Sequence, residues 1–165
     1  MQNSDLLISN RNGVYQIKVS GRANFEYAVP LRNIAKGSGI IKGIVIDLGS
    51  CTAMDSTFMG VLTMFALKGK REQTQVELYN ANATLQKLLR DLGVAKLFSF
   101  KEGEMEQAGE GENSAAGNSL LTTAETVSEA HKALVDADSA NQEKFRTVID
   151  FADADVARIK KEQNN

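Results

Sequence analysis

The sequence has few of the residue types from which redox, metal and catalytic centres are built. Its 165 residues include one cysteine, one histidine and no tryptophan, and 6% of them are aromatic. Cys51 has no partner for an internal disulfide, and because it follows an apolar segment we expect a buried, unreactive thiol. A single histidine, His131, excludes a histidine-rich metal site. We expect His131 on the surface of a helix, solvated or partly packed rather than catalytic.

The sequence also lacks the patterns that bind phosphate or hold paired metal ions. It has no P-loop spacing, no glycine-rich phosphate cradle and no second acidic pair near Asp47 and Asp55. With His131 expected on a helix surface, a Ser-His-acid triad is excluded too. We therefore predict no enzymatic activity, no metal and no cofactor. The hypothesis of a small enzyme acting on a nucleotide or lipid is supported only by the crevice that an α/β sheet usually offers.

Basic charge and long apolar runs are missing as well. The formal net charge is -2 and the pI is near 5.5, so the chain has no basic field for a nucleic-acid backbone. No apolar stretch approaches the length of a membrane span, and residues 1–13 do not resemble a signal peptide. With 42% hydrophobic and 24% charged residues, the composition is typical of a globular domain. We expect a cytoplasmic protein without nucleic-acid or membrane partners.

Residues 1–100 alternate between strand and helix patterns. Strands are predicted at 6–9, 14–20, 43–48, 76–81 and 95–100, and helices at 24–37, 57–72 and 83–93. The first two strands read as a hairpin. The near-continuous apolar run at 43–48 predicts a central strand covered on both faces. The order indicates an α/β fold with a mixed β-sheet, reached by right-handed crossovers.

Two further segments follow this α/β domain. Residues 101–119 are rich in glycine and glutamate with few large apolar side chains, which predicts a mobile acidic linker. Residues 120–165 contain neither glycine nor proline and are helical by composition. Capping boxes are possible at Thr122 with Glu125 and at Ser139 with Gln142.

The helical extension carries a seam of apolar residues at heptad-type spacing. Its members are Val127, Ala130, Leu134 and Ala137, followed by Phe145, Ile149, Ala152, Val156 and Ile159. Periodicity leaves open whether the extension is one long helix or a helix pair bent near Ser139. The polar Asn141 and Lys144 between the two runs favour a pair that folds back, and a homodimer through the seam is a further possibility.

Two hydroxyls and a carboxylate lie where the central strand passes into a helix. Asp55, Ser56 and Thr57 directly follow the apolar segment 44–54 and precede the helical pattern. A helix start needs a side-chain oxygen for its free N–H groups, so one of these residues could be a cap alone. The same position is also a natural anion site, because the helix dipole favours negative charge there.

This stretch, "IVIDLGSCTAMDSTFMGVL", resembles the signature of the STAS domain family of bacterial anti-sigma-factor antagonists. The resemblance covers roughly residues 5–100. It implies a STAS-like mixed β-sheet with helices packed mainly on one face, to which residues 120–165 add a helical extension. In such antagonists the hydroxyl after the Asp accepts phosphate from a serine kinase that is also the anti-sigma factor. The matching residue is Ser56, supported by Asp55 and Thr57.

The resemblance also suggests which residues contact a partner. Asn24 stands where antagonists often carry Asp, and Phe58 and Met59 precede Gly60 where the family commonly has Gly directly after the second hydroxyl. Met54, Phe58 and Met59 are either core residues or a partner-binding surface beside Ser56. We take Asn24, Met54, Phe58 and Met59 as candidate partner contacts.

The function that follows is a switch in partner binding. Unphosphorylated, the chain would bind an anti-sigma factor that is also a serine protein kinase and so release its client; phosphorylation of Ser56 would end the contact, and a metal-dependent serine phosphatase would restore it. Ser56 is therefore expected to be solvent-exposed. The alternative is a non-switching STAS scaffold or oligomerisation subunit that uses the C-terminal helices.

Overall fold

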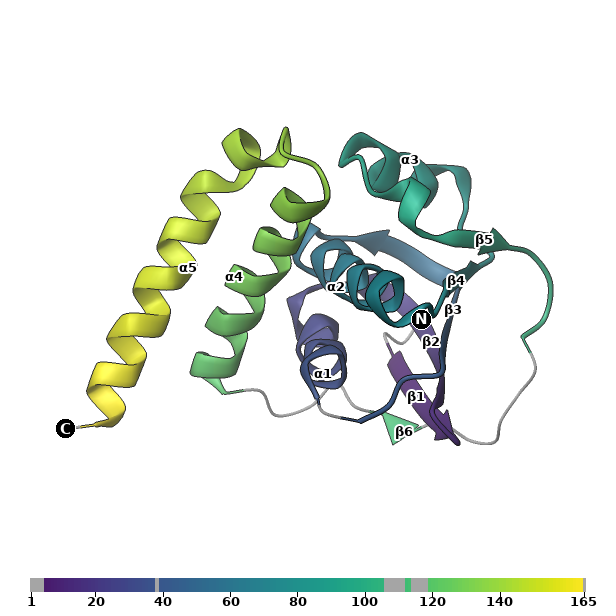
Figure 1. Cartoon of the computed structure of the whole chain (residues 1–165), viewed down its shortest axis with the longest axis horizontal. Coiled ribbons are helices and arrows are strands. Elements are labelled where there is room, and N and C mark those ends of the chain that lie inside the picture. The colour runs from purple at the N-terminus through teal and green to yellow at the C-terminus, as the bar shows by residue number, and fades with distance from the viewer. Residues whose placement is uncertain (1–4, 38, 106–111, 114–118, 165) are drawn as a thin grey trace.

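The computed structural model describes residues 5–37, 39–105, 112–113 and 119–164 (Figure 1). The strands are β1 (Asp5–Arg11), β2 (Val14–Ala23), β3 (Gly43–Met54), β4 (Val76–Tyr79), β5 (Ser99–Lys101) and β6 (Glu112–Asn113). The helices are α1 (Phe25–Lys36), α2 (Ser56–Glu72), α3 (Ala83–Asp91), α4 (Leu120–Ala137) and α5 (Asn141–Gln163), with a short 3-10 helix η1 (Ala95–Leu97). The last predicted strand therefore begins late, because its first residues form η1.

The strands form one mixed sheet in the order β5-β4-β3-β2-β1-β6, which confirms the predicted α/β fold. β1 and β2 are an antiparallel hairpin, joined at Asn12 and Gly13, where both φ angles are positive as a tight hairpin turn requires. β2, β3, β4 and β5 run parallel to one another. The carboxyl ends of β2 and β3 therefore lie at the same edge of the sheet, where α1 and α2 begin.

Burial along the central strand alternates. Ile44, Ile46 and Leu48 are buried, whereas Val45 and Asp47 between them are only partly buried. Figure 1 shows α1 and α2 over one face of the sheet, in line with the predicted one-sided packing. Reading the apolar run at 43–48 as a strand covered on both faces was wrong. Such a run also occurs where one face is packed and the other carries a partly exposed valine.

The helical extension consists of two helices that lie side by side. In Figure 1, α1 and α2 lie between the sheet and α4, and α5 lies on the far side of α4. α4 packs on α2 and α1, and α5 packs on α4. The seam residues Phe145, Ala152 and Ile159 are buried. We call α4 and α5 together the C-terminal hairpin; its inner surface meets helices rather than the sheet.

The turn of the hairpin is held by Asn141. This side chain is 2% exposed, and its nitrogen donates to the carbonyl oxygens of Leu92 at 2.9 Å and Leu134 at 2.8 Å. It links the end of α4 to the segment after α3. A polar residue between the apolar runs thus has a structural role at the bend, since buried amides need such partners.

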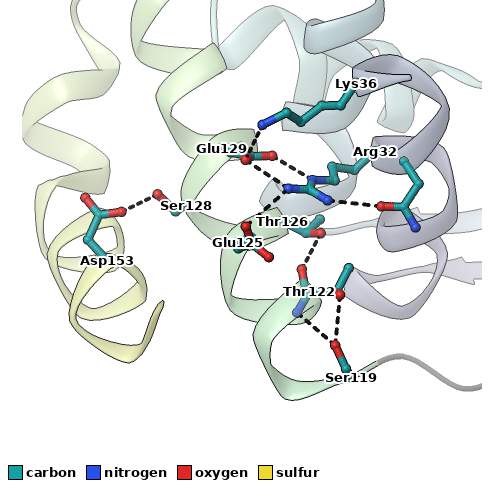
Figure 2. Close-up of polar contacts among 10 residues, drawn as sticks. Arg32, Lys36, Ser119, Thr122, Glu125, Thr126, Ser128, Glu129 and Asp153 are labelled. Carbon is teal, nitrogen blue, oxygen red and sulfur yellow. Dashed lines mark hydrogen bonds and ion pairs between the residues drawn. The ribbon is translucent and has the colours of Figure 1, made fainter. Parts of the chain in front are cut away.

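Helix caps explain where several elements begin. Asn82 accepts from the N–H of Leu85 at the start of α3, as its sequence context predicts. α4 is capped by Ser119, whose hydroxyl accepts from the N–H of Thr122 (Figure 2), so the box predicted at Thr122 lies three residues too late. α5 has no side-chain cap, and the second predicted box does not form.

The predicted linker at 101–119 lies mostly outside the described residues. Lys101 ends β5, and Glu112 and Asn113 form β6, which pairs antiparallel with Ile8 and Leu7 of β1. Within the described part of the chain, no helix combines the length and apolar character that crossing a membrane requires.

Candidate functional site

The candidate site lies at the edge where β2 and β3 pass into α1 and α2. Ala23 and Met54, the last residues of the two strands, are register partners. The next residue in each chain segment caps a helix: Asn24 accepts from the N–H of Glu26, and Asp55 from the N–H of Phe58. The N–H of Asp55 donates to the carbonyl of Ala23 at 3.0 Å, which joins the two helix starts.

Asp55 supplies the N-cap of α2. Its Oδ1 lies 2.7 Å from the nitrogen of Phe58. Burial raises the pKa of this carboxyl, while the N–H groups of Phe58 and Phe25 and the nearby His131 act in the opposite direction. Capping of the helix therefore does not require the Ser56 hydroxyl, and the cap alternative raised by the sequence applies to Asp55.

Ser56, the first residue of α2, is only partly buried but is not free. Its Oγ lies 2.8 Å from Nε2 of His131, a residue of α4 that is 75 positions further along the chain. The expectation of an openly exposed hydroxyl was wrong, because the C-terminal hairpin covers this side of α2. Thr57 is 7% exposed and therefore belongs to the interior of the first turn.

His131 is buried rather than on a helix surface, which corrects the sequence-based expectation. It is 2% exposed, and its ring meets that of Phe145 edge-on with centroids 4.9 Å apart. Nδ1 lies 2.7 Å from the carbonyl oxygen of Val127. A carbonyl can only accept, so Nδ1 carries the proton and Nε2 accepts from the Ser56 hydroxyl. Burial lowers the pKa of His131, which favours this neutral form.

The spacing of the apolar seam in residues 127–137 could have indicated that His131 is buried. His131 follows the seam residue Ala130 and precedes Leu134 by three positions, so it lies next to the inward stripe of the helix. Spacing can place a side chain on the packed face of its helix. It cannot say which other helix that face meets, and so the contact with Ser56 was not predictable.

Three of the proposed partner contacts lie in the core. Met54, Phe58 and Met59 are 7%, 0% and 5% exposed and belong to the main hydrophobic cluster. The folded chain does not present them as a surface, so their role here is packing. Asn24 remains partly buried at the edge of the sheet beside Asp55.

Cys51 is buried, as expected for an unreactive thiol, and burial raises its pKa. Among the described residues, no group of three or more His, Cys, Asp or Glu side chains is arranged to hold a metal ion. The chemically distinctive feature of this edge is therefore the hydroxyl of Ser56, with the Asp55 carboxylate on one side and His131 on the other.

Stability is expected to fall as the pH drops below about 6.5 because of His131. Burial lowers its pKa in the folded chain, so the unfolded chain binds the proton more readily. The contribution of His131 is complete above its ordinary pKa of 6.5 and is lost as the pH falls below it. The slope from one such group is at most about 1.4 kcal/mol per pH unit, and urea denaturation at several pH values measures it.

The matched variant for this measurement is His131→Gln, which does not titrate. It should lose most of the pH dependence in this range. The contribution of Asp55 to the pH dependence of stability has the opposite sign. Burial raises its pKa above 3.8, so the folded chain takes up that proton before the unfolded chain does as the pH falls. An unchanged pH slope in the glutamine variant would contradict the assignment to His131.

Known proteins resemble the α/β part of the chain. A family model described as "Mlab, STAS domain" matches residues 10–99. The structure of the anti-sigma factor antagonist SpoIIAA in its unphosphorylated form has a TM-score of 0.51 at 14% identity, over 61% of this chain and 90% of that one. A sulfate transporter family protein from Wolinella succinogenes has a TM-score of 0.48 at 18% identity, over 56% and 80%. No curated protein matches the sequence. At these identities, the structural likeness concerns the fold.

Proposed function

Because the chain belongs to the STAS domain family, we propose that it is an anti-sigma-factor antagonist whose partner binding is switched by phosphorylation of Ser56. The structure with a similar fold is described as an anti-sigma factor antagonist in its unphosphorylated form. The observation that carries the choice of residue is the cap of α2. Asp55 caps the helix, so the hydroxyl of Ser56 can be modified without removing the cap.

The switch acts through charge. A kinase transfers the γ-phosphoryl group of ATP to the Ser56 oxygen, which gives up its proton, and ADP leaves. The phosphate brings about -1.5 to -2 charges and three acceptor oxygens. The N-terminus of α2 favours negative charge, whereas the Asp55 carboxylate beside it repels the phosphate. The α/β domain stays folded, and a partner surface that meets Ser56 is lost.

In this proposal the chain is a binding module rather than an enzyme. The unphosphorylated form binds an anti-sigma factor that is also a serine protein kinase and thereby releases its client. A metal-dependent serine phosphatase restores the hydroxyl. Asn24, beside Asp55 at the same edge of the sheet, is the proposed partner contact, and the exchange takes place in the cytoplasm.

The test is phosphorylation by a serine kinase of the anti-sigma-factor class, followed by mass spectrometry. The wild-type chain and Thr57→Ala are expected to gain one phosphate on Ser56, and Ser56→Ala none. Ser56→Ala should lose about 1–3 kcal/mol of the free energy of unfolding, because the buried Nε2 of His131 is left without its hydrogen-bond partner. Labelling of the Ser56→Ala variant would show that another residue is the acceptor.

A non-switching scaffold is the second candidate. The heptad seam itself packs within the chain, so self-association would need another surface. Two large apolar side chains exposed on α5, Phe151 at 70% and Val148 at 38%, favour such a surface. A scaffold would keep its partner whether or not Ser56 is modified.

A further inference from the structure

The inner surface of the C-terminal hairpin fits closely against the start of α2. A Cβ atom added to Gly60 would lie 2.3 Å from the carbonyl oxygen of Ala130 and 2.7 Å from its Cβ, so the two helix backbones touch at this point. Gly60 lies about one helical turn beyond Ser56. The covering of Ser56 is therefore part of a close helix-helix contact and not of a single side chain.

Charge complementarity holds the same helix against α1. Figure 2 shows Glu129 of α4 between Arg32 and Lys36 of α1. The guanidinium nitrogens of Arg32 lie 2.7 and 3.0 Å from the Glu129 carboxylate, the geometry of a bidentate pair, and Lys36 Nζ lies 2.6 Å away. Glu125 adds a longer contact to Arg32 at 3.7 Å. An acidic side of α4 thus meets a basic side of α1.

α5 keeps α4 in place from outside. Ser128 of α4 donates to Asp153 of α5 (Figure 2). Lys132 of α4 pairs with the same carboxylate at 3.1 Å. α5 packs on α4, so the two helices can move as one unit. The hairpin follows residues 102–119 in the chain, of which Glu112 and Asn113 form β6 and pair with β1.

A phosphate on Ser56 has no place beneath this hairpin. Oγ is already 2.8 Å from Nε2 of His131, and the neutral ring presents a lone pair there. A phosphoryl group would set three oxygens and negative charge against that lone pair and the Asp55 carboxylate. The buried ring is also packed against Phe145 and bonded through Nδ1 to the carbonyl oxygen of Val127, and both contacts would be lost if it turned away.

We propose that α1 and the first half of α2 form a helix-docking surface that α4 occupies within the chain, and that phosphate on Ser56 expels the C-terminal hairpin from it. The proposal deepens the proposed function, because it concerns the same serine. The partner of the proposed function competes with α4 for this surface through a similar helix, with a small residue over Gly60 and carboxylates toward Arg32 and Lys36. The phosphate that expels α4 therefore excludes the partner as well. Ser56 is reached by a kinase only when the hairpin is undocked.

The test is hydrogen exchange of the full chain with phosphoserine incorporated at position 56 during synthesis, so that no kinase is needed. Amides of α4 should exchange at least tenfold faster than in the unmodified chain, while those of β3 stay protected. The matched control carries phosphoserine in place of Thr84, which is exposed in the first turn of α3 and so adds the same charge at another helix N-terminus. The control should leave α4 protected.

Three results would overturn the inference: α4 equally protected with phosphoserine at 56, equal opening of α4 in the control, or loss of protection in β3 as well. The first means that the phosphate fits, the second that charge alone opens the hairpin, and the third that the domain unfolds. These outcomes are separate from the kinase test, since failure of phosphorylation at Ser56 would remove the proposed function without touching the exchange result.

Discussion

Replacing Gly60 with alanine is expected to separate α4 from α2. The new Cβ would lie 2.3 Å from the carbonyl oxygen of Ala130, an atom of the α4 backbone that cannot turn aside as a side chain can. Overpacking of this kind costs about 1–3 kcal/mol and occasionally more. In an exposed helix the same change would stabilise by about 1 kcal/mol, so a loss of stability in Gly60→Ala isolates the effect of the contact.

Urea denaturation and hydrogen exchange of α4 measure this effect. The matched control is Gly39→Ala, because an added Cβ there meets no atom within 4 Å. We expect the control to stay within about 1 kcal/mol of the wild type, as for other unstrained glycine replacements. If Gly60→Ala keeps full stability and a protected α4, the two helices have room to spare and the close contact does not hold the hairpin.

Truncating Phe58 is expected to have the largest effect on the α/β domain. Its side chain is fully buried in the main hydrophobic cluster beneath the first turns of α2. Buried Phe→Ala changes typically cost about 3–5 kcal/mol, because transfer free energy is lost and a cavity remains. Phe58→Ala should lower the free energy of unfolding by this amount, as measured by chemical denaturation.

The control is Phe151→Ala on α5, where the side chain is 70% exposed. Surface changes of this kind usually stay within about 0.5 kcal/mol. A Phe58→Ala chain that is as stable as the control but weaker in partner binding would restore Phe58 as a contact residue. The expected result instead assigns Phe58 to packing, with any loss of binding following from unfolding.

Local signals in the sequence were enough to predict most strands and helices of the α/β domain. The hairpin turn at Asn12 and Gly13, the cap at Asn82 and the helix after Asp55 all depend on residues within one turn of one another. The start of α4 was predicted three residues too late, because two hydroxyls, those of Ser119 and Thr122, are both suitable caps there. Either hydroxyl can accept from a backbone N–H three residues on, so spacing alone does not choose between them.

The site was predictable in part. The segment at Asp55 and Ser56 predicted a helix N-terminus with a modifiable hydroxyl, and the structure adds that Asp55 is the residue that caps. Taking Met54, Phe58 and Met59 as partner contacts was wrong, because all three are buried in the core; methionine and phenylalanine at this spacing occur both in cores and at binding surfaces.

Residues near one another in the chain therefore suffice for the α/β order, the family resemblance and the place of Ser56 at a helix start, because strand periodicity and capping act over a few residues. The pairing of Ser56 with His131, the fit of Ala130 on Gly60 and the ion pairs of Glu129 needed the folded chain. These contacts join α4 to helices about 70 to 100 residues earlier, and their geometry depends on which surfaces meet when the core packs. Periodicity marks the inward face of α4, but only packing against α1 and α2 chooses its position, because an apolar stripe can be buried equally well on any complementary surface.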